Sequence, residues 1–187
     1  MGKTIIPPEI QTLSSRLVYE NRWLSLREDR ILRPSGYEGI YSVVEKRDFA
    51  VIAAIQDGMI RLVEQYRYPV AGRYWELPQG SWDKDNADPC ALAAAELREE
   101  TGLIAERMQH VGRLFLAYGL SNQAYDIFLA SGLSHAQTDL EPEEEGLISR
   151  AFPLSVVEQM IMDGTIVDAS TVAAWGLLKM KGLLPSD

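Results

Sequence analysis

The order of strand-like and helix-like segments is the feature that most constrains the fold of this 187-residue chain. Residues 16–47 alternate apolar and polar side chains over short runs, which indicates strands and turns. In residues 49–68, two apolar runs flank Asp57-Gly58, a dipeptide that favours a tight hairpin. One helix-like segment follows, then more strand-like residues, then two helix-like segments. This order predicts an α+β fold, with a mixed sheet layered between helices rather than a regular βαβ alternation.

The ends of the predicted helices carry residues with characteristic roles. Asp88 suits an N-cap, and Gly102 is a stop signal for the helix predicted between them. Residues 155–164 and 168–182 each begin with a capping-type residue and end near a glycine, so they are predicted to form two more helices. Residues 69–88 are rich in Pro, Gly and Asp and are predicted to form a loop-bearing connection.

Composition excludes several classes of protein. With 18 basic and 27 acidic residues, the net charge of −9 argues against nucleic acid as a partner. The single cysteine, Cys90, rules out an intrachain disulfide, and with two histidines beside it a zinc site of Cys and His is not expected. The sequence has no signal-peptide pattern and no apolar run of membrane-spanning length, so a soluble cytoplasmic protein without a membrane partner is predicted.

Three glutamates, Glu96, Glu99 and Glu100, are crowded into one turn of the predicted helix. At about 100° per residue their side chains share one arc of about 100°, where like charges repel. One explanation is a solvated helix face. The other is a bound cation, because Mg²⁺ and Mn²⁺ prefer carboxylate oxygens. The preceding residues 76–80, "ELPQG", form a turn that can bring backbone carbonyl oxygens near the helix.

The sequence from Gly80 to Leu103 resembles the Nudix box. The positions that match its second half are Glu96, Leu97, Glu99, Glu100, Gly102 and Leu103. Three features depart from the pattern. The spacing from Gly80 to the first of these glutamates is one residue longer, Ala87 replaces the first glutamate of the box, and Ala95 replaces an arginine that braces a neighbouring carboxylate in the family. Arg98 is a candidate substitute for that arginine.

The resemblance extends to residues 63–80 and 143–179, which are similar to the ADP-ribose pyrophosphatase branch of the family. It implies a Nudix αβα sandwich at residues 46–187 and a small N-terminal β subdomain at residues 1–45. It also implies a Mg²⁺-dependent hydrolase, with Mn²⁺ as the other candidate ion. The implied reaction is ADP-ribose plus water giving AMP and ribose 5-phosphate.

The same resemblance implies roles for individual residues. Glu96 and Glu100 would bind the metal ion, Glu99 would share it or orient water, and the carbonyl oxygen of Gln79 would complete the site. A catalytic base is expected in the acidic loop "EPEEEG", where Glu145 and Glu144 are favoured over Glu143; for each of them a merely solvated loop is the alternative.

Four further residues are candidates for binding substrate. An arginine would hold the phosphates, an aromatic side chain of the N-terminal strands would stack on the adenine, and a glutamate before the box would contact ligand or pair with a basic neighbour. Exposed charge and ordinary aromatic packing are the alternatives. These candidates are Arg67, Trp23, Tyr41 and Glu76.

The strands of residues 16–47 are too few to build a core of their own. In the branch that the chain resembles, such strands reach a partner subunit, so a homodimer is predicted. Two other functions remain open: hydrolysis of another sugar nucleotide such as GDP-mannose, and binding of a ligand with little turnover. Ala87 and Ala95 favour the second, and the retained glutamates argue against it.

Overall fold

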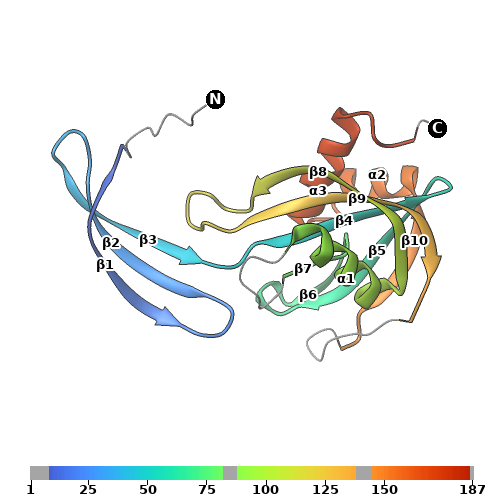
Figure 1. The fold of residues 1–187 in the computed structure, drawn as a ribbon, viewed down its shortest axis with the longest axis horizontal. Coiled ribbons are helices and arrows are strands. Elements are labelled where there is room, and N and C mark those ends of the chain that lie inside the picture. The colour runs from blue at the N-terminus through green and yellow to red at the C-terminus, as the bar shows by residue number, and fades with distance from the viewer. Residues whose placement is uncertain (1–8, 82–87, 138–144, 186–187) are drawn as a thin grey trace. The chain divides into compact units, whose positions relative to one another are not determined.

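The computed structural model describes residues 9–81, 88–137 and 145–185. They fall into two compact units: Met1–Arg47 with Ala117–Gln123, and Asp48–Leu116 with Ala124–Asp187 (Figure 1). The strands are β1 (Gln11–Glu20), β2 (Ser25–Leu32), β3 (Glu38–Glu45), β4 (Phe49–Gln56), β5 (Met59–Arg67), β6 (Gly72–Glu76), β7 (Gln79–Gly80), β8 (Leu103–Phe115), β9 (Ala124–His135) and β10 (Ile148–Pro153). The helices are α1 (Pro89–Thr101), α2 (Leu154–Met162), α3 (Ala169–Met180) and a 3₁₀ turn at Tyr68–Val70.

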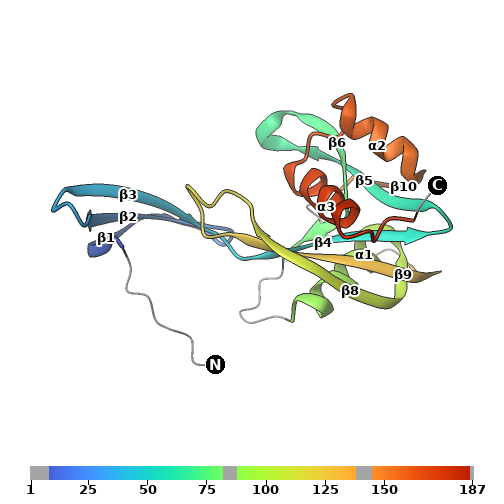
Figure 2. The ribbon, with the colours of Figure 1, turned by 90° about the horizontal axis from the view of Figure 1, so that it is seen from above.

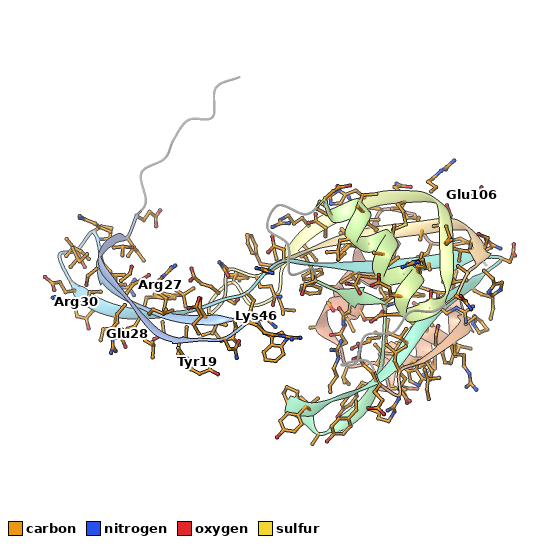
Figure 3. All side chains as sticks on the ribbon, turned by 60° about the horizontal axis from the view of Figure 1, so that its bottom comes forward. Tyr19, Arg27, Glu28, Arg30, Lys46 and Glu106 are labelled. Atoms are coloured by element: carbon orange, nitrogen blue, oxygen red, sulfur yellow. The ribbon has the colours of Figure 1, made fainter. Side chains whose placement is uncertain are left out.

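The first unit is a three-stranded antiparallel sheet in the order β1-β2-β3. Residues 117–123 join it, because Val44 N–H donates to Leu120 O at 2.9 Å and the Tyr41 hydroxyl donates to Gly119 O at 2.9 Å. Side chains project from both faces of this sheet (Figure 3). Every residue of β1 is exposed. The first unit therefore has hydrogen-bonded strands but almost no hydrophobic core.

The second unit is a mixed sheet of seven strands. Its main order is β10-β5-β4-β9-β8, with β6 paired to β5 and β7 paired to β4. β4 and β9 run parallel, and the other ladders are antiparallel. α1 covers one face of the sheet, and α2 and α3 cover the other (Figure 2). The predicted α+β fold with a sheet between helices is confirmed.

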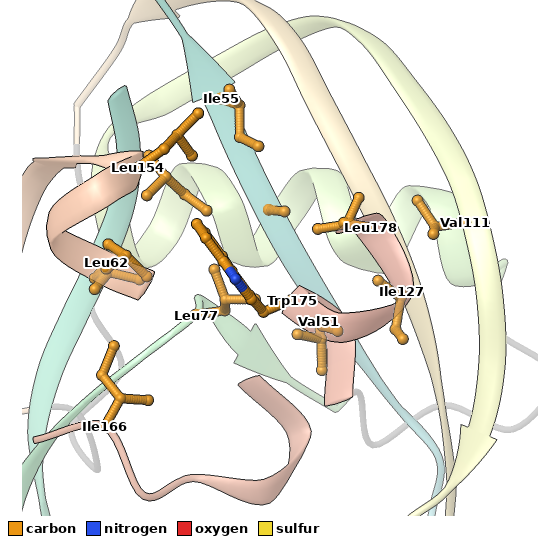
Figure 4. Close-up of a cluster of buried hydrophobic side chains, with 14 of the residues drawn as sticks. Val51, Ile55, Leu62, Leu77, Val111, Ile127, Leu154, Ile166, Trp175 and Leu178 are labelled. Carbon is orange, nitrogen blue, oxygen red and sulfur yellow. The ribbon is translucent and has the colours of Figure 1, made fainter. Parts of the chain in front are cut away.

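The apolar sequence of β4 explains these layers. Because side chains alternate along a strand, Val51 and Ile55 point into a cluster with Trp175 and Leu178 of α3 (Figure 4), whereas Ile52 points into a second cluster under α1. β4 is apolar on both faces, as expected for a strand covered on both sides.

Most of the predicted element ends are confirmed. Asp57 and Gly58 have φ of 53° and 73° and connect β4 to β5, as a type I′ turn requires. The Asp88 carboxylate accepts hydrogen bonds from the backbone N–H groups of residues 90 and 91, and Gly102 ends α1 with φ of 65°. Asp168 caps α3 through the N–H of Thr171.

One predicted helix start is wrong, and one predicted connection contains strands that the sequence did not indicate. α2 begins at Leu154 after Pro153 and has no side-chain cap, so Ser155 does not start it. Residues 69–88 were expected to form a loop-bearing connection, but they include β6 and β7. A strand as short as β7, Gln79–Gly80, is set by its pairing with β4 rather than by local propensity. Among the described residues, no helix is both long and apolar enough to cross a membrane.

Candidate active site

The candidate site is built around β7, where the sheet divides. β4 and β5 pair only at Ile55–Ile60 and Gln56–Met59, next to their hairpin turn. Beyond that point β5 pairs with β6, and β4 pairs with β7 through Ala50–Gly80 and Val51–Gln79. The short segment that links β6 to β7 therefore lies where the two halves of the sheet part.

Glu96 and Glu100 of α1 are both buried, with 7% and 2% of their surface exposed, and both reach β7. Glu100 Oε2 accepts a hydrogen bond from Gln79 N–H at 3.1 Å. A Cβ placed on Gly80 would overlap the Glu96 carboxylate, so the glycine makes room for this carboxylate in the position it occupies. The two carboxylates, four residues apart on α1, thus contact two successive residues of β7.

Glu99 lies differently from the other two glutamates. It is half-buried, and its Oε1 is 3.7 Å from a guanidinium nitrogen of Arg98. Within residues 9–81, 88–137 and 145–185, no three His, Cys, Asp or Glu side chains are gathered closely enough to hold a metal ion. The three glutamates of the predicted arc therefore differ in burial: Glu96 and Glu100 are buried, whereas Glu99 is half-buried. Carboxylate oxygens such as those of Glu96 and Glu100 are ligands that a hard divalent cation prefers.

Glu76 and Arg67 form an ion pair next to this site. Arg67 Nε donates to Glu76 Oε2 at 3.1 Å, a second guanidinium nitrogen contacts Oε1, and Gln65 Nε2 donates to Oε1 at 2.8 Å. Burial raises the pKa of the Glu76 carboxyl above its usual value of 4.5, and the charge of Arg67 opposes this rise. Glu76 thus pairs with a basic neighbour, and its contact with a ligand stays a prediction.

Two predicted base-stacking residues, Trp23 and Tyr41, lie in the first unit. Trp23 is 57% exposed in the turn between β1 and β2, and the Arg22 guanidinium lies 4.4 Å from its ring centre. Trp23 lines a cavity of about 240 Å³ together with Arg22, Lys46 and Arg47. Tyr41 lies on β3 and is bound to Gly119 O through its hydroxyl.

The predicted base falls at the edge of what the structure describes. Glu145 is exposed in the turn before β10. The root of this turn is fixed to β6, because Arg73 donates to Gly146 O at 2.7 Å. Glu144, Glu143 and Ala87 lie outside the described residues.

Sequence reasoning missed the contribution of α3 to the site. In its first turn, Ser170 and Thr171 are 1% exposed; Ser170 contacts Gln79 of β7, and Thr171 contacts Leu77 between β6 and β7. The sequence "DAST" could only reveal a helix cap, because the contacted residues are more than 90 positions away in the chain.

A second missed group joins β8 to β9 and β4. Asp126 is bound by His110 at 2.8 Å and by Arg113 at 2.6 Å, and Arg113 also contacts Asp48. These hydrogen bonds raise the pKa of Arg113, chiefly through Asp48. Asp48 in turn accepts the N–H of Ala124 at 2.8 Å. These contacts join β8, β9 and the residue before β4, and the charged side chains pair with one another.

Comparison with known proteins identifies the family of this chain. A model described as the NUDIX domain matches residues 46–173, and one described as a nucleoside diphosphate sugar hydrolase N-terminal domain matches residues 10–44. The chain belongs to the Nudix family. It is a Nudix hydrolase, and hydrolases of this family generally use divalent metal ions.

Individual relatives agree with this assignment. The chain is 32% identical to an "ADP-ribose pyrophosphatase" of Mycobacterium tuberculosis, over 88% of this chain and 81% of that protein. It is 25% identical to an "ADP-ribose pyrophosphatase" of Bacillus subtilis, over 94% of this chain and 96% of that protein. It is 28% identical to a "Methanol dehydrogenase activator" of Bacillus methanolicus, over 98% of each. A solved structure described as an ADP compounds hydrolase has the same fold, with a TM-score of 0.83, 20% identity, and coverage of 96% of this chain and 98% of that one.

Proposed function

We propose that this Nudix hydrolase cleaves the diphosphate bond of a nucleoside diphosphate sugar. The proposed substrate is ADP-ribose, which with water gives AMP and ribose 5-phosphate. Two relatives that share most of the chain's length bear the name ADP-ribose pyrophosphatase. The match of residues 10–44 to the N-terminal domain of nucleoside diphosphate sugar hydrolases supports the same substrate class.

The pair of buried carboxylates beside β7 is the observation that carries the proposal. Glu96 and Glu100 are buried against a strand whose Gly80 leaves no room for a side chain. With the carbonyl oxygen of Gln79 they would hold Mg²⁺, or Mn²⁺ in its place. The ion would neutralise the charge of the diphosphate and lower the pKa of a bound water. In a protein with a net charge of −9, such neutralisation is needed before a dianionic substrate can approach the site.

The remaining residues take their proposed roles around this pair. The half-buried Glu99 would share the metal or orient the attacking water. Glu145 or its neighbour Glu144 would act as the base that accepts the proton of that water. Glu145 lies in the turn before β10, and Arg73 ties the neighbouring Gly146 to β6.

Substrate recognition is proposed for a second set of residues. The guanidinium of Arg67 would bind the phosphates, with Glu76 holding its planar group in place through two contacts. Trp23 or Tyr41 would stack on the adenine, since a flat aromatic ring is the group best suited to a base. The cavity that Trp23 lines is also lined by three basic side chains, which suit an anionic nucleotide: Arg22, Lys46 and Arg47.

We also propose that the N-terminal subdomain, residues 1–45, forms a homodimer. Eight large apolar side chains in the described part of residues 1–45 are at least 36% exposed, and apolar surface of this kind suits association with a partner. They are Leu13, Leu17, Val18, Tyr19, Trp23, Tyr37, Ile40 and Tyr41. Light scattering should show a dimer for the whole chain and a monomer for a chain that starts at residue 46. A monomeric whole chain at assay concentration would contradict this proposal.

One experiment tests the function. The protein is incubated with a panel of compounds, ADP-ribose, GDP-mannose and dinucleotides among them, with Mg²⁺ or Mn²⁺, and the products are separated by chromatography. ADP-ribose is expected to give the highest kcat/KM. Glu96→Gln and Glu100→Gln should each lower kcat by about 100-fold or more, because a metal ligand is lost while the size of the side chain is kept. Unchanged turnover in both variants would refute the metal site.

A second candidate is a ligand-binding protein with little turnover. Ala95 is half-buried where the family pattern has a bracing arginine, and the Bacillus methanolicus relative is named as an activator of another enzyme. Calorimetric titration separates the two: binding of ADP-ribose without product formation, in the presence of Mg²⁺ and Mn²⁺, would favour this candidate.

A further inference from the structure

We propose that Thr171 and Ser170, at the start of α3, are positioning residues that fix the segment Leu77–Gly80 against the two buried carboxylates. The inference rests on the proposed function, because it assumes that the carbonyl oxygen of Gln79 is a metal ligand. It adds a part of the molecule, the N-terminus of α3, that the motif on α1 does not include.

Thr171 makes the most direct of these contacts. Its Oγ1 accepts the backbone N–H of Leu77 at 2.9 Å and donates to Asp168 Oδ2 at 2.7 Å. A hydroxyl has one proton, so donation to the carboxylate leaves its lone pairs directed at the N–H group of Leu77. The Thr171 hydroxyl thus has a fixed direction, set by the residue that caps the helix.

Ser170 extends the contact to Gln79 itself. Its Oγ lies 2.6 Å from Gln79 Oε1 and 2.5 Å from Asp168 Oδ2. The single hydroxyl proton can serve one of these two acceptors at a time. If it serves Asp168, rotation of the Gln79 amide by half a turn presents an N–H group to Ser170, so the side chain of Gln79 stays tied to α3 in either case.

The segment needs such support because its own ladder is short. β7 has two residues, and Pro78 before it has no N–H to donate. Pro78 O accepts from Ile52 N–H at 2.9 Å, which ties one edge of the segment to β4. Besides its pairing with β4, the backbone of the segment is bound by two helices: Glu100 of α1 accepts from Gln79 N–H, and Thr171 of α3 accepts from Leu77 N–H.

These two helices lie on opposite faces of the sheet. The peptide that precedes Gly80 is therefore held from both sides, by the proposed metal-binding helix on one face and by the cap of α3 on the other. Ser170, Thr171 and Leu77 are each 1% exposed, so water does not readily replace the contact. A shift of this peptide would move the Gln79 carbonyl oxygen relative to Glu96 and Glu100, although no atom of α3 is proposed to touch metal or substrate.

The test compares Thr171→Val with Thr165→Val in the full-length protein. Valine keeps the shape of threonine and removes the hydroxyl. Thr165 is a matched control, because its Oγ1 also donates to an aspartate, Asp163 Oδ1 at 2.7 Å, but in an exposed turn. Mn²⁺ affinity is measured without substrate by electron paramagnetic resonance of the free ion, kcat and KM are measured with ADP-ribose, and the unfolding temperature is recorded.

Thr171→Val is expected to weaken Mn²⁺ binding about 10-fold, in the range seen when groups that orient metal ligands are removed. It should lower kcat and leave the KM for ADP-ribose within about twofold, because the substrate-binding side chains are untouched. Thr171→Ser retains the hydroxyl and should restore Mn²⁺ affinity. Thr165→Val should bind Mn²⁺ as the unaltered protein does.

Equal Mn²⁺ affinity in Thr171→Val and Thr165→Val would overturn the inference, even if Thr171→Val lowers the unfolding temperature. If Thr171→Val does not fold, Ser170→Ala decides in its place, with a weakened Mn²⁺ affinity supporting the inference and an unchanged one overturning it. Glu100→Gln separates this failure from that of the proposed function. Unaltered protein that binds no Mn²⁺, or binds it equally well after Glu100→Gln, would refute the metal site and the inference that depends on it.

Discussion

The two units of this molecule differ in what holds them together. In the second unit, β4 is buried on both faces, and Ala50 to Ala53 are 0% exposed. In the described part of the first unit, Ile31 is the one buried hydrophobic residue, and β1 is exposed along its length. The first unit has hydrogen-bond ladders and cross-strand ion pairs, but ladders without apolar burial give marginal stability at best.

The difference indicates a division of tasks. The buried carboxylates need a rigid frame, and the second unit supplies one, with a packed helix on either side of the sheet. The first unit presents apolar and aromatic side chains to the outside, which suits association with another surface better than independent folding. The following predictions test this contrast.

The largest effect is expected when the units are separated. At a concentration low enough to keep it monomeric, a peptide of residues 1–47 should show no cooperative thermal transition by circular dichroism, because the monomer has no core to lose. A chain that begins at residue 46 should still unfold cooperatively, since both hydrophobic clusters lie within it. A sharp transition in the isolated peptide would show that the first unit is stable by itself and would end the contrast.

Matched isoleucines give the next largest effect. Ile52 is 0% exposed under α1, and Ile40 is 64% exposed on β3. Ile52→Ala should lower the free energy of unfolding by about 2–5 kcal/mol, because a cavity is left in a packed cluster. Ile40→Ala should change it by no more than about 0.5 kcal/mol. Urea unfolding at low protein concentration measures both, and a loss at Ile40 that approaches that of Ile52 would mean that a partner covers this face.

Sequence patterns predicted the second unit better than the first. The apolar run of β4, the Asp57-Gly58 turn and the capped ends of α1 are local signals, and the structure confirms each of them. The helical repeat of 3.6 residues predicted that Glu96, Glu99 and Glu100 share one arc, whereas the choice of Glu96 and Glu100 as metal ligands came from the resemblance to the Nudix box. Local signals could not show that Glu99 is less buried than Glu96 and Glu100, since its burial depends on which residues pack against α1.

Contacts between distant residues escaped prediction for the same reason. The bond from Leu77 to Thr171 joins residues 94 positions apart, and the pairing of Gly80 with Ala50 belongs to a strand too short for any periodic signal. The role of Gly80 could be read only as a motif position. In the structure it is the lack of a Cβ that lets the Glu96 carboxylate approach.

A smaller effect on stability is expected from breaking one ion pair in each unit. Arg67–Glu76 in the second unit has side chains 39% and 2% exposed, whereas the partners of Arg16–Glu28 in the first are 70% and 34% exposed. Arg67→Ala should cost about 1–3 kcal/mol at neutral pH, below the full value for a buried pair because Arg67 reaches solvent. Arg16→Ala should cost at most about 1 kcal/mol.

The pH dependence distinguishes these pairs further. Burial already raises the pKa of Glu76, and loss of Arg67 would raise it more. A carboxyl with a raised pKa in the folded state makes the free energy of unfolding fall as pH rises from its usual value through the folded one. The loss caused by Arg67→Ala should therefore shrink on acidification toward pH 4.5, the usual carboxyl value, when measured by urea unfolding at several pH values. A loss that does not vary with pH would show that Arg67 acts through packing alone.

The smallest effect concerns the contribution of the first unit to activity. Trp23 lines the cavity with the basic residues, whereas Tyr37, in the same unit and 66% exposed, lies outside it. Stacking on a base stabilises bound substrate and transition state alike, so Trp23→Ala should raise the KM for ADP-ribose several-fold, about 1 kcal/mol, with kcat nearly unchanged. Tyr37→Ala should leave both constants unchanged. Steady-state kinetics measures this difference: a fall in kcat after Trp23→Ala would place the first unit in the chemical step, and equal constants in the two variants would leave the second unit to recognise the substrate alone.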